Sequence, residues 1–510
     1  FARAVMSTIS TLDFRVQNAV NFIDSLYGEE GENDAYVFIG KPTPWPDENK
    51  PPLPVGNLQE FFDVYQQMLS LRRIQGNECF SMIRRINWQS GVVYDYYRHD
   101  YSFENPAYSM ATKLEDARFY AINSNNDVYV CLFNSNNRPS IVEPQNQNYD
   151  PFFTSDGYQW MKLFSIKQQV LNDFSTLNFL PVTTDGANLD NMPRTAGEVT
   201  TVIIDNRGDG YTINPGGGAE NEIETYYCKI VGDGDGAVAS VQVTPPAVTN
   251  PEIGQGVGAV RIVRPGAGYT YATLDFVAGR CYSSLADLDA GVNGLDPRGD
   301  GTFRSTVIIN PALGWGADLH RQLIATTAGV FSTFNYNLSD FFPDTTFRQI
   351  GILQNPDVRD GIPEGAATLS GVYGFKVLEI EGQPEFVIGE MIYQQRFNEE
   401  LQRTQTAKGM IVGWDEGEKI IRYIQIPSEH VDDDGVLYQF DASTFIQGSV
   451  SNKVVEPLAY TGSLAGLLFE NGFADVEVQR YTGNMVYLSN ITAVQRQPTQ
   501  TERISLLIQF

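Results

Sequence analysis

The stretch that decides the fold is YTGNMVYLSNITAVQRQPTQTERISLLIQF, which spans residues 481–510. Residues 485–488 have the apolar character of a short strand, and a polar stretch with one proline follows them. Apolar side chains then recur at every second position from Ile504 to Phe510. Because successive side chains of a strand point to opposite faces, this alternation predicts a second strand with one buried face. We therefore expect the segment to be paired into a sheet and not to trail free.

The composition indicates several domains that are rich in β-structure. A chain of 510 residues predicts roughly two to four domains. Hydrophobic residues make up 42% and aromatic residues 12%, while 46 glycines and 26 prolines are scattered along the chain and predict frequent turns. The predicted fold class is mainly β with a few helices (α+β), built from sandwich- or barrel-like modules with inserted domains.

The charge and the cysteines limit the partners that we expect. A formal net charge of −27 disfavours binding to nucleic acid and to anionic membranes, because both need a basic surface. Acidity also keeps a large protein soluble, and a partner with basic patches is the sharper alternative. Four well-separated cysteines favour a reducing environment, although pairing of Cys228 with Cys281 stays open. No apolar run is long enough for a transmembrane helix, and FARAVMSTIS does not have the apolar core of a secretory signal.

The first seventy residues predict two helices around one strand. Apolar residues at helical spacing predict an amphipathic helix over 10–27, and AYVFIG at 35–40 predicts a strand. The prolines between Lys41 and Gly56 predict a rigid extended connector. Asn57 and Glu60 have the spacing of a capping box at the start of a second helix. Its expected buried stripe comprises Leu58, Phe61, Phe62, Tyr65, Met68 and Leu69.

Farther along, strand signals dominate. Aromatic and β-branched runs predict strands within 80–165, among them 92–103, 118–133 and 156–166, and a short helix is expected within 166–180. Residues 196–310 are rich in glycine and have no helix signal. They contain a weak repeat, TVIIDNRGDGYT at 201–212 and AVRIVRPGAGYT at 259–270, which predicts one compact β-domain. The strand signals of 365–480 predict a small barrel or a stack of hairpins.

These signals divide the chain into five predicted segments. They are a core of helices and strands at 1–190, a glycine-rich inserted β-domain at 191–310, a return to the core at 311–360, a second inserted β-domain at 361–480, and C-terminal strands that complete the core at 481–510.

No catalytic or metal-binding pattern stands out. His99, His320 and His430 have no paired ligand spacing, and neither a G-x-S-x-G elbow nor a phosphate loop occurs. A loose G-x-G-x-x-A match at 254–259 is not placed between a strand and a helix. The acidic turns do not complete a calcium loop, and RGDG, which occurs twice, suits turns. Opportunistic calcium binding stays open, but we expect neither an enzyme nor a cofactor.

Seven short motifs occur in a fixed order along the chain. They are DFRVQNAVNFIDSL (13–26), VFIGKPTPWP (37–46), RRINW (84–88), VYVCLF (128–133), DGYQWMKLFSI (156–166), FRQIGILQNP (347–356), and G-x-M-x-Y-x-x-N followed by Q-T-E-x-I-x-x-L-x-x-F from 483 to 510. Their order and sequence resemble the baseplate wedge subunit encoded by gene eight of T-even-like contractile-tailed phages. The residues taken as family-motif positions are Phe38, Trp45, Arg84, Arg85, Trp88, Gly157, Tyr158, Trp160, Phe347, Arg348, Asn355, Pro356, Gly483, Tyr487, Gln500, Thr501 and Glu502.

The resemblance implies a structural virion protein. It implies a homodimer that packs against other wedge proteins in the tail baseplate, is assembled in the host cytoplasm, and takes part in the rearrangement that triggers sheath contraction. The motif residues would then be structural, and the regions near 190–310 and 360–480 would be insertions typical of larger relatives. A carbohydrate-binding or glycan-cleaving tail or surface protein is the alternative, supported by aromatic β-structure and acidic loops. A secreted adhesin would predict disulfides and a cleaved signal.

Overall fold

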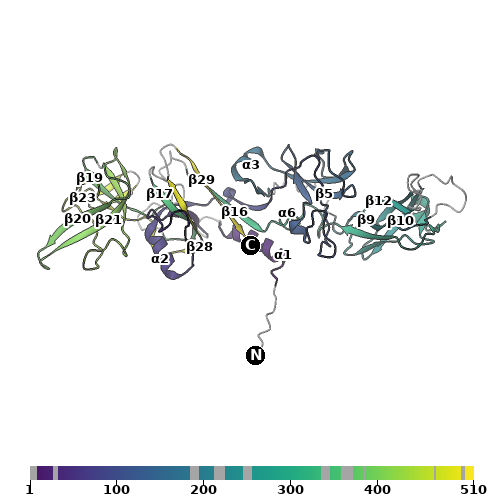
Figure 1. Ribbon diagram of the computed structural model, residues 1–510, viewed down its shortest axis with the longest axis horizontal. Coiled ribbons are helices and arrows are strands. Elements are labelled where there is room, and N and C mark those ends of the chain that lie inside the picture. The colour runs from purple at the N-terminus through teal and green to yellow at the C-terminus, as the bar shows by residue number, and fades with distance from the viewer. Residues whose placement is uncertain are drawn as a thin grey trace, which may run out of the picture. The chain divides into compact units, whose positions relative to one another are not determined.

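The computed structural model describes most of the chain and divides it into two compact units. The described residues are 9–26, 33–183, 195–211, 224–244, 256–334, 345–357, 372–383, 385–464, 467–495 and 500–510. Unit 1 holds the described residues of Phe1–Ala19, Phe80–Thr327 and Gln509–Phe510. Unit 2 holds those of Val20–Cys79 and Ala328–Ile508. Strands far outnumber helices in both units, so the predicted mainly β fold class is confirmed (Figure 1).

Unit 2 contains an antiparallel sheet built from segments that are far apart in the sequence. Its strand order is β18-β2-β1-β17-β28. The strands are β1 (Ala35–Gly40), β2 (Met68–Arg73), β17 (Thr346–Gln354), β18 (Val372–Tyr373) and β28 (Asn484–Gln495). All six residues of β1 are buried, which explains why AYVFIG is a continuous apolar run and not an alternating one. The sheet thus depends on three distant parts of the chain at once.

A closed barrel forms the second part of unit 2. Its sheet runs in the order β22-β21-β20-β23-β24-β19-β27, and an additional β19–β22 pairing closes it. Its strands are β19 (Lys376–Glu381), β20 (Met391–Asn398), β21 (Arg403–Asp415), β22 (Ile420–Ile424), β23 (Ile446–Gly448), β24 (Val454–Pro457) and β27 (Phe473–Ala474). The expected turn at Glu416–Lys419 joins β21 to β22. Of the two predicted forms, a small barrel or a stack of hairpins, the structure has the barrel.

The C-terminal alternation also forms the strand that the sequence predicts. β29 (Glu502–Gln509) lies next to β16 (Thr327–Phe334) in its sheet. Ile504 and Leu506 are buried, whereas Ser505 between them is exposed. A strand with one covered face shows this alternation.

Unit 1 contains a four-stranded antiparallel sheet with large aromatic side chains on it. The order is β4-β5-β7-β6, with β4 (Tyr120–Ile122), β5 (Asp127–Asn134), β6 (Phe152–Phe153) and β7 (Tyr158–Ser165). Nearby, β3 (Cys79–Arg84) pairs with β8 (Phe179–Pro181). The helices of this part are α3 (Gln168–Phe174), which the sequence predicts, and α6 (Leu319–Gln322). One core contains the inward side chains of β5 and β7 together with Trp315 and Leu319.

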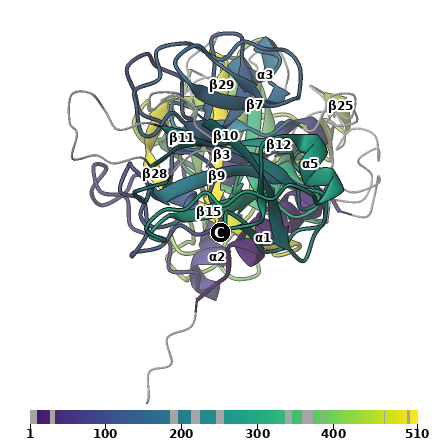
Figure 2. The same cartoon turned by 90° about the vertical axis from the view of Figure 1, so that its right-hand side faces the viewer.

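The glycine-rich region of unit 1 forms a β module of its own. Its sheet has the order β12-β11-β10-β13, with β14 also paired to β10, and β9 pairs with β15 (Figures 1 and 2). The strands are β9 (Val199–Asn206), β10 (Glu224–Gly232), β11 (Val238–Thr244), β12 (Gly256–Arg264), β13 (Ala272–Leu274), β14 (Cys281–Tyr282) and β15 (Arg304–Ile309). The expected absence of helices is wrong, because α5 (Leu285–Ala290) contacts β10 and β14. The Ser284 side chain caps the start of α5. This capping signal was missed because the prediction relied on the high glycine content of the region.

The two copies of the sequence repeat have the same local structure. Gly208 and Gly210 of the first copy, and Gly266 and Gly268 of the second, all have a φ between +62° and +78°. A Cβ on Gly208 would lie 2.4 Å from the ring of Tyr211, the buried tyrosine that follows it. The second copy buries Tyr269 in the same way. Glycine is needed here because L side chains rarely adopt this backbone conformation.

We expect the module to be removable. Val199 of β9 lies opposite Ile309 of β15, so the chain enters and leaves the module at neighbouring positions. Thr201 and Ile308 are also directly opposite each other, and an Asn-Gly turn can join them in place of residues 202–307. The loss of half-buried Ile203 from the core should cost about 1 to 2 kcal/mol. The shortened chain should stay soluble and melt cooperatively in calorimetry; loss of that melt would contradict the expectation.

The second helix differs from its prediction on one face. α2 (Leu58–Gln67) begins where expected, and the Asn57 side chain accepts a hydrogen bond from the Glu60 N–H at 2.8 Å. The predicted buried stripe is wrong at Leu58, which is 71% exposed, and at Phe62, which is 42% exposed. The helix buries residues only in its last turns, where it leads into β2. The first helix, α1 (Leu12–Leu26), agrees with its predicted range.

The thiols of Cys228 and Cys281 are neighbours but not bonded. All four cysteines are free and buried. Cys228 lies directly opposite Cys281 across β10 and β14, with 3.6 Å between the two Sγ atoms. The sequence left the pairing of these two cysteines open, and the structure shows them as free thiols on neighbouring strands.

Candidate functional site

The motif residues of unit 2 hold the proline-rich connector against the sheet. Trp45 donates from Nε1 to the carbonyl of Ile491 in β28 at 3.0 Å. Arg348 of β17 donates from Nε to Glu48 at 2.8 Å and from Nη1 to the carbonyl of Pro42 at 2.6 Å. The backbone N–H of Trp45 also donates to Glu48. These contacts hold a segment that the structure describes outside any strand and that is not extended throughout as predicted, because it turns where the Lys50 N–H donates to the Asp47 carbonyl.

Other motif residues of unit 2 allow close backbone approaches. Asn355 exchanges two hydrogen bonds with Asp34, at 2.6 and 2.7 Å. A Cβ on Gly483 would lie 2.6 Å from the carbonyl oxygen of Gln354 and 2.8 Å from the nitrogen of Pro356. Gly483 also has a φ of +76°, so both space and backbone conformation require glycine there.

The remaining motif residues of unit 2 belong to strands or lie beside one. Buried Phe38 lies opposite Gly351, whose missing side chain makes room for the Phe38 ring. Phe347 is buried in β17, and Tyr487 of β28 lies opposite Ile352. Glu502 begins β29, directly after Gln500 and Thr501. The structure does not bring these residues together into one site.

In unit 1, the aromatic motif residues form a packed cluster. Trp160 is fully buried, stacks on Tyr158 with ring centroids 5.6 Å apart, and contacts Tyr94 edge to face. Gly157, with a φ of +87°, makes the turn before β7, and a Cβ there would lie 2.6 Å from Ser135 Oγ. Trp88 donates from Nε1 to Ser140 Oγ at 3.2 Å. These side chains stabilise the module by packing.

The two motif arginines lie outside the aromatic cluster and line a pocket, which Tyr94 of the cluster also lines. Arg84 is the last residue of β3, Arg85 follows it, and both face a cavity of about 560 Å³. Arg118, from the segment before β4, lines the same cavity and was not singled out by any sequence motif. Amide side chains and a few apolar side chains complete the walls, and none of the described lining residues is acidic. We call this cavity the arginine pocket.

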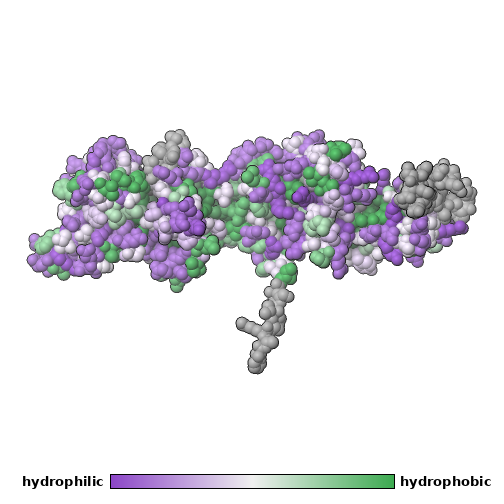
Figure 3. Space-filling view, viewed as in Figure 1, coloured by the Kyte–Doolittle hydropathy of each residue, from purple (hydrophilic) through white to green (hydrophobic). Residues whose placement is uncertain are grey.

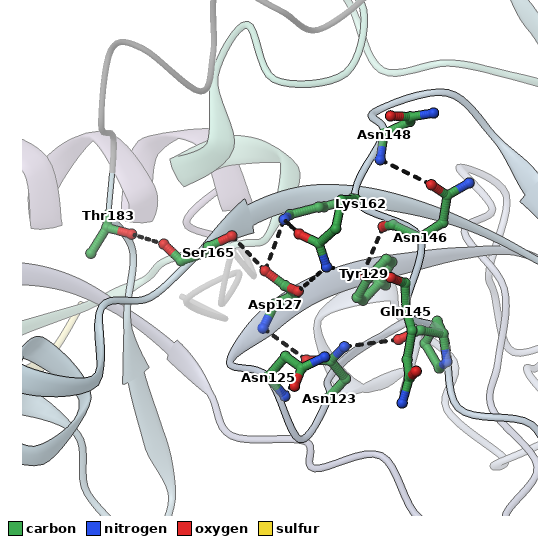
Figure 4. A network of polar contacts seen from close by, with 12 residues as sticks. Asn123, Asn125, Asp127, Tyr129, Gln145, Asn146, Asn148, Lys162, Ser165 and Thr183 are labelled. Atoms are coloured by element: carbon green, nitrogen blue, oxygen red, sulfur yellow. Dashed lines mark hydrogen bonds and ion pairs between the residues drawn. The ribbon is translucent and has the colours of Figure 1, made fainter.

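A buried polar network lies at one end of the β5–β7 pair (Figure 4). Lys162 Nζ lies 2.9 Å from Asp127 Oδ1, and both side chains are about 5% exposed or less. Gln147 donates to Asp127 at 2.8 Å and accepts from Lys162 at 2.5 Å, while Ser165 donates to Asp127 at 2.5 Å. Burial raises the pKa of Asp127, but the hydrogen bonds from Lys162, Ser165 and Gln147 outweigh it and hold this pKa below its usual value. The network ties the loop of Gln147 to the sheet.

The other candidates from the sequence are accounted for locally. His430 is buried, its Nδ1 accepts from the Ile426 N–H, and burial lowers its pKa to about 4. The described residues hold no group of three or more His, Cys, Asp or Glu side chains placed to share a metal ion. The two RGDG turns bond to each other, since Asp300 donates its N–H to the Asp209 carbonyl at 2.8 Å. Gly254 of the loose G-x-G-x-x-A match lies outside the described residues, and Gly256 begins a strand.

Among the described carboxyl groups of unit 2, that of Glu477 has a pKa shifted to near neutrality. Burial raises the pKa to about 7, although the Tyr373 N–H donates to its Oε2 at 2.9 Å and opposes the shift. An acid with a raised pKa in the folded state stabilises that state below the pKa of the unfolded chain. The contribution is lost as pH rises through the folded pKa, here between about pH 4.5 and about pH 7.

We therefore expect Glu477→Gln to make unit 2 more stable than the wild type at pH 8, by about 2 to 3 kcal/mol, and to have little effect at pH 4.5. Chemical denaturation at several pH values measures the difference. His430 changes stability in the opposite sense over part of this range, so the variant must be compared with the wild type at each pH. Exposed Glu418→Gln is the control. An effect of the same size at both pH values would contradict this assignment.

Two comparisons of the sequence with known proteins found no match. No known protein-family model matches the chain, and no curated protein matches it. None of the helices in the described ranges has the length and apolar character needed to cross a bilayer.

Proposed function

We propose that the chain is a structural virion protein, a wedge component of a contractile tail baseplate that works through protein contacts. The proposal rests on the ordered motifs and on the mechanical role of most of their residues. The connector clamp at Trp45 and Arg348 and the tight turn at Gly483 serve to hold distant segments in place. Rigid building blocks that switch between packed arrangements need this kind of internal support.

One observation carries the proposal: several apolar side chains of the connector and of α2 are exposed to solvent on a backbone that hydrogen bonds hold in place. We call these side chains the connector patch. Leu53 is 87% exposed, Val55 76%, Leu58 71% and Phe62 42%. They are close in sequence, on the connector and the first turns of α2. The face of the molecule in Figure 3 is largely hydrophilic, with smaller hydrophobic areas among the polar ones.

Hydrogen bonds hold the backbone of the connector patch in place. The Glu60 carboxylate accepts from the N–H groups of Val55 and Gly56 at 2.8 and 2.7 Å. Asn490 of β28 donates to the Pro52 carbonyl at 2.8 Å. Prolines limit the remaining freedom of this segment. A patch that is already ordered loses little conformational entropy when it binds, which is typical of a contact surface.

By the same proposal, the chain forms a homodimer and packs against other wedge proteins. Immunogold electron microscopy of purified tails tests the location: antibodies against the chain should label the baseplate end. Incubation with host polysaccharide tests the glycan alternative. Absence of label from intact virions, or release of sugar by the purified chain, would overturn the proposal.

The connector patch should be needed for assembly but not for folding. Because its side chains are exposed, the double change Leu53→Asp with Leu58→Asp should alter the free energy of unfolding by no more than about 0.5 kcal/mol per site. Incorporation into tail particles should fall at least tenfold, because charged groups would have to be desolvated in the contact. Leu177→Asp, at a residue that is 92% exposed in unit 1, is the matched control. Equal incorporation of both variants would count against a contact role.

A further inference from the structure

The arginine pocket lies where the ends of three strands of unit 1 meet. Arg84 ends β3, Phe179 begins β8 opposite it, and Arg118 precedes β4. The cavity measures about 560 Å³, which is within the usual range for sites that hold a small organic molecule. The pairing of Arg84 with Phe179 fixes the backbone on one side of the pocket.

The charges in this pocket are unusual for so acidic a protein. The chain has a net charge of −27, and many of its arginines form ion pairs with carboxylates, among them Arg15, Arg72, Arg98, Arg348 and Arg396. Within the described part of the chain, no carboxylate pairs with any of the three arginines of the pocket. Three guanidinium groups that share one cavity repel each other, so an anion placed among them would be stabilised.

The pocket arginines also keep unused hydrogen-bond donors. Each guanidinium has five N–H donors. Arg84 donates to the Ala117 carbonyl at 2.9 Å, and its side chain also forms a hydrogen bond with the Tyr120 hydroxyl. Arg85 uses two, to Asn87 Oδ1 and to the Thr176 carbonyl. The side chain of Arg118 makes no hydrogen bond to any described residue. Most of the guanidinium donors are therefore available to a ligand.

The rest of the lining fits the body of an organic ligand. Amide groups of Asn87, Gln89 and Asn178 can donate or accept, and Ile86 and Val92 supply apolar wall. A nucleic acid or another long polyanion needs an extended basic surface, which a protein of this net charge does not favour. A compact cavity with three arginines fits a small ligand with several oxyanion groups.

We propose that the arginine pocket is a binding site for a small organic anion with two or more carboxylate or phosphate groups. The guanidinium of Arg118 binds one oxyanion through paired N–H donors, Arg84 and Arg85 bind the next, and the apolar wall contacts the carbon skeleton. This site does not depend on the proposed role in a tail, since it follows from the pocket alone.

Isothermal titration calorimetry of the full chain at low salt tests the proposal with two probes. Citrate represents a polycarboxylate, and inorganic pyrophosphate represents a phosphate ligand. At least one should bind saturably with one site per chain, and the tighter probe identifies the class of oxyanion. Arg118→Gln should weaken that binding tenfold or more, because a hydrogen bond to a charged group is lost. The side chain of Arg118 supports no described contact, so this variant should fold normally.

Two further variants make the test specific. Arg138→Gln removes one positive charge from an exposed position of the same module outside the pocket, and it should bind like the wild type. Arg84→Lys keeps the charge but loses the forked geometry, and it should bind more weakly than the wild type. Absence of saturable binding with both probes would overturn the proposal. The proposal would also be overturned if Arg138→Gln lost as much affinity for the probe as Arg118→Gln, because the binding would then respond to net charge alone.

Discussion

Removal of Ile504–Phe510 should abolish the cooperative folding of unit 2. The deletion takes away most of β29, leaving only its first two residues, and removes buried Ile504 and Leu506. Truncation of a buried Ile or Leu to Ala costs about 2 to 5 kcal/mol, and the deletion also removes the backbone hydrogen bonds of the strand. Whole domains are stable by only about 5 to 15 kcal/mol, so the loss is comparable with the total. Calorimetry should show no cooperative melt for this unit.

Aggregation is a further expected result of this truncation. β16 is buried at all but one of its eight positions and would present an unpaired edge without β29. Ser505→Asp, on the exposed face of β29, should melt like the wild type, whereas Leu506→Ala should lose about 2 to 5 kcal/mol. A truncated chain that stays soluble and melts in the same cooperative transitions would contradict the role given to this strand.

Some elements were predictable because a short stretch of sequence, such as an apolar run, a helix cap or a hairpin turn, is enough to indicate them. β1 was predicted over 35–40 because a continuous apolar run forms a strand that is covered on both faces. The start of α2 was predicted because a capping side chain acts within three residues. The barrel was predicted from hairpins whose turn and strands are adjacent in sequence. In each case the signal in the sequence is local, although the pairing of β19 with β22 that closes the barrel is not.

The aromatic run at 92–103 shows where this reasoning fails. It was predicted as a strand, but the described structure has only an isolated bridge there, from Val92 to Ser140. Tyr94 and Tyr97 are buried, as aromatic residues tend to be. The carboxylate of buried Asp95, however, accepts hydrogen bonds from the backbone N–H groups of Ser109 and Arg118. Composition indicated burial correctly for these two tyrosines but not for Phe103, which is 89% exposed. The backbone N–H of Tyr97 donates to the Cys131 carbonyl, a partner that no pattern within the run indicates.

The arginine pocket was only partly predictable for the same reason. Arg84 and Arg85 drew attention as neighbours in a motif, although they were expected to be structural. Arg118 is more than thirty residues away, and no local pattern marks it. Only the pairing of β3 with β8 and the path of the chain into β4 bring it to the same cavity. Tertiary structure, and not residue type, creates that site.

The buried ion pair of Lys162 and Asp127 leads to the second large effect. Lys162→Met should destabilise unit 1 by about 3 to 5 kcal/mol, because it leaves the Asp127 carboxylate buried without its cation. Ser165 and Gln147 would still donate to Asp127, so the unit should remain folded but melt at a lower temperature. Denaturant titration with an unchanged slope would show that the loss is one of stability and not of compactness.

Two matched variants separate the cost of an unpaired charge from the value of the pair itself. In Asp127→Leu with Lys162→Met, both charges are gone, and replacement of a buried pair by apolar groups is often close to neutral; the double variant should therefore recover most of the stability lost in Lys162→Met. Arg264→Met breaks the exposed pair with Asp289, where both side chains are at least 44% exposed, and should cost no more than about 1 kcal/mol. If Lys162→Met were as mild as Arg264→Met, water would have to reach Asp127 in solution. The polar network would then be a hydrated surface feature, and the loop of Gln147 would not be tied to the sheet through it.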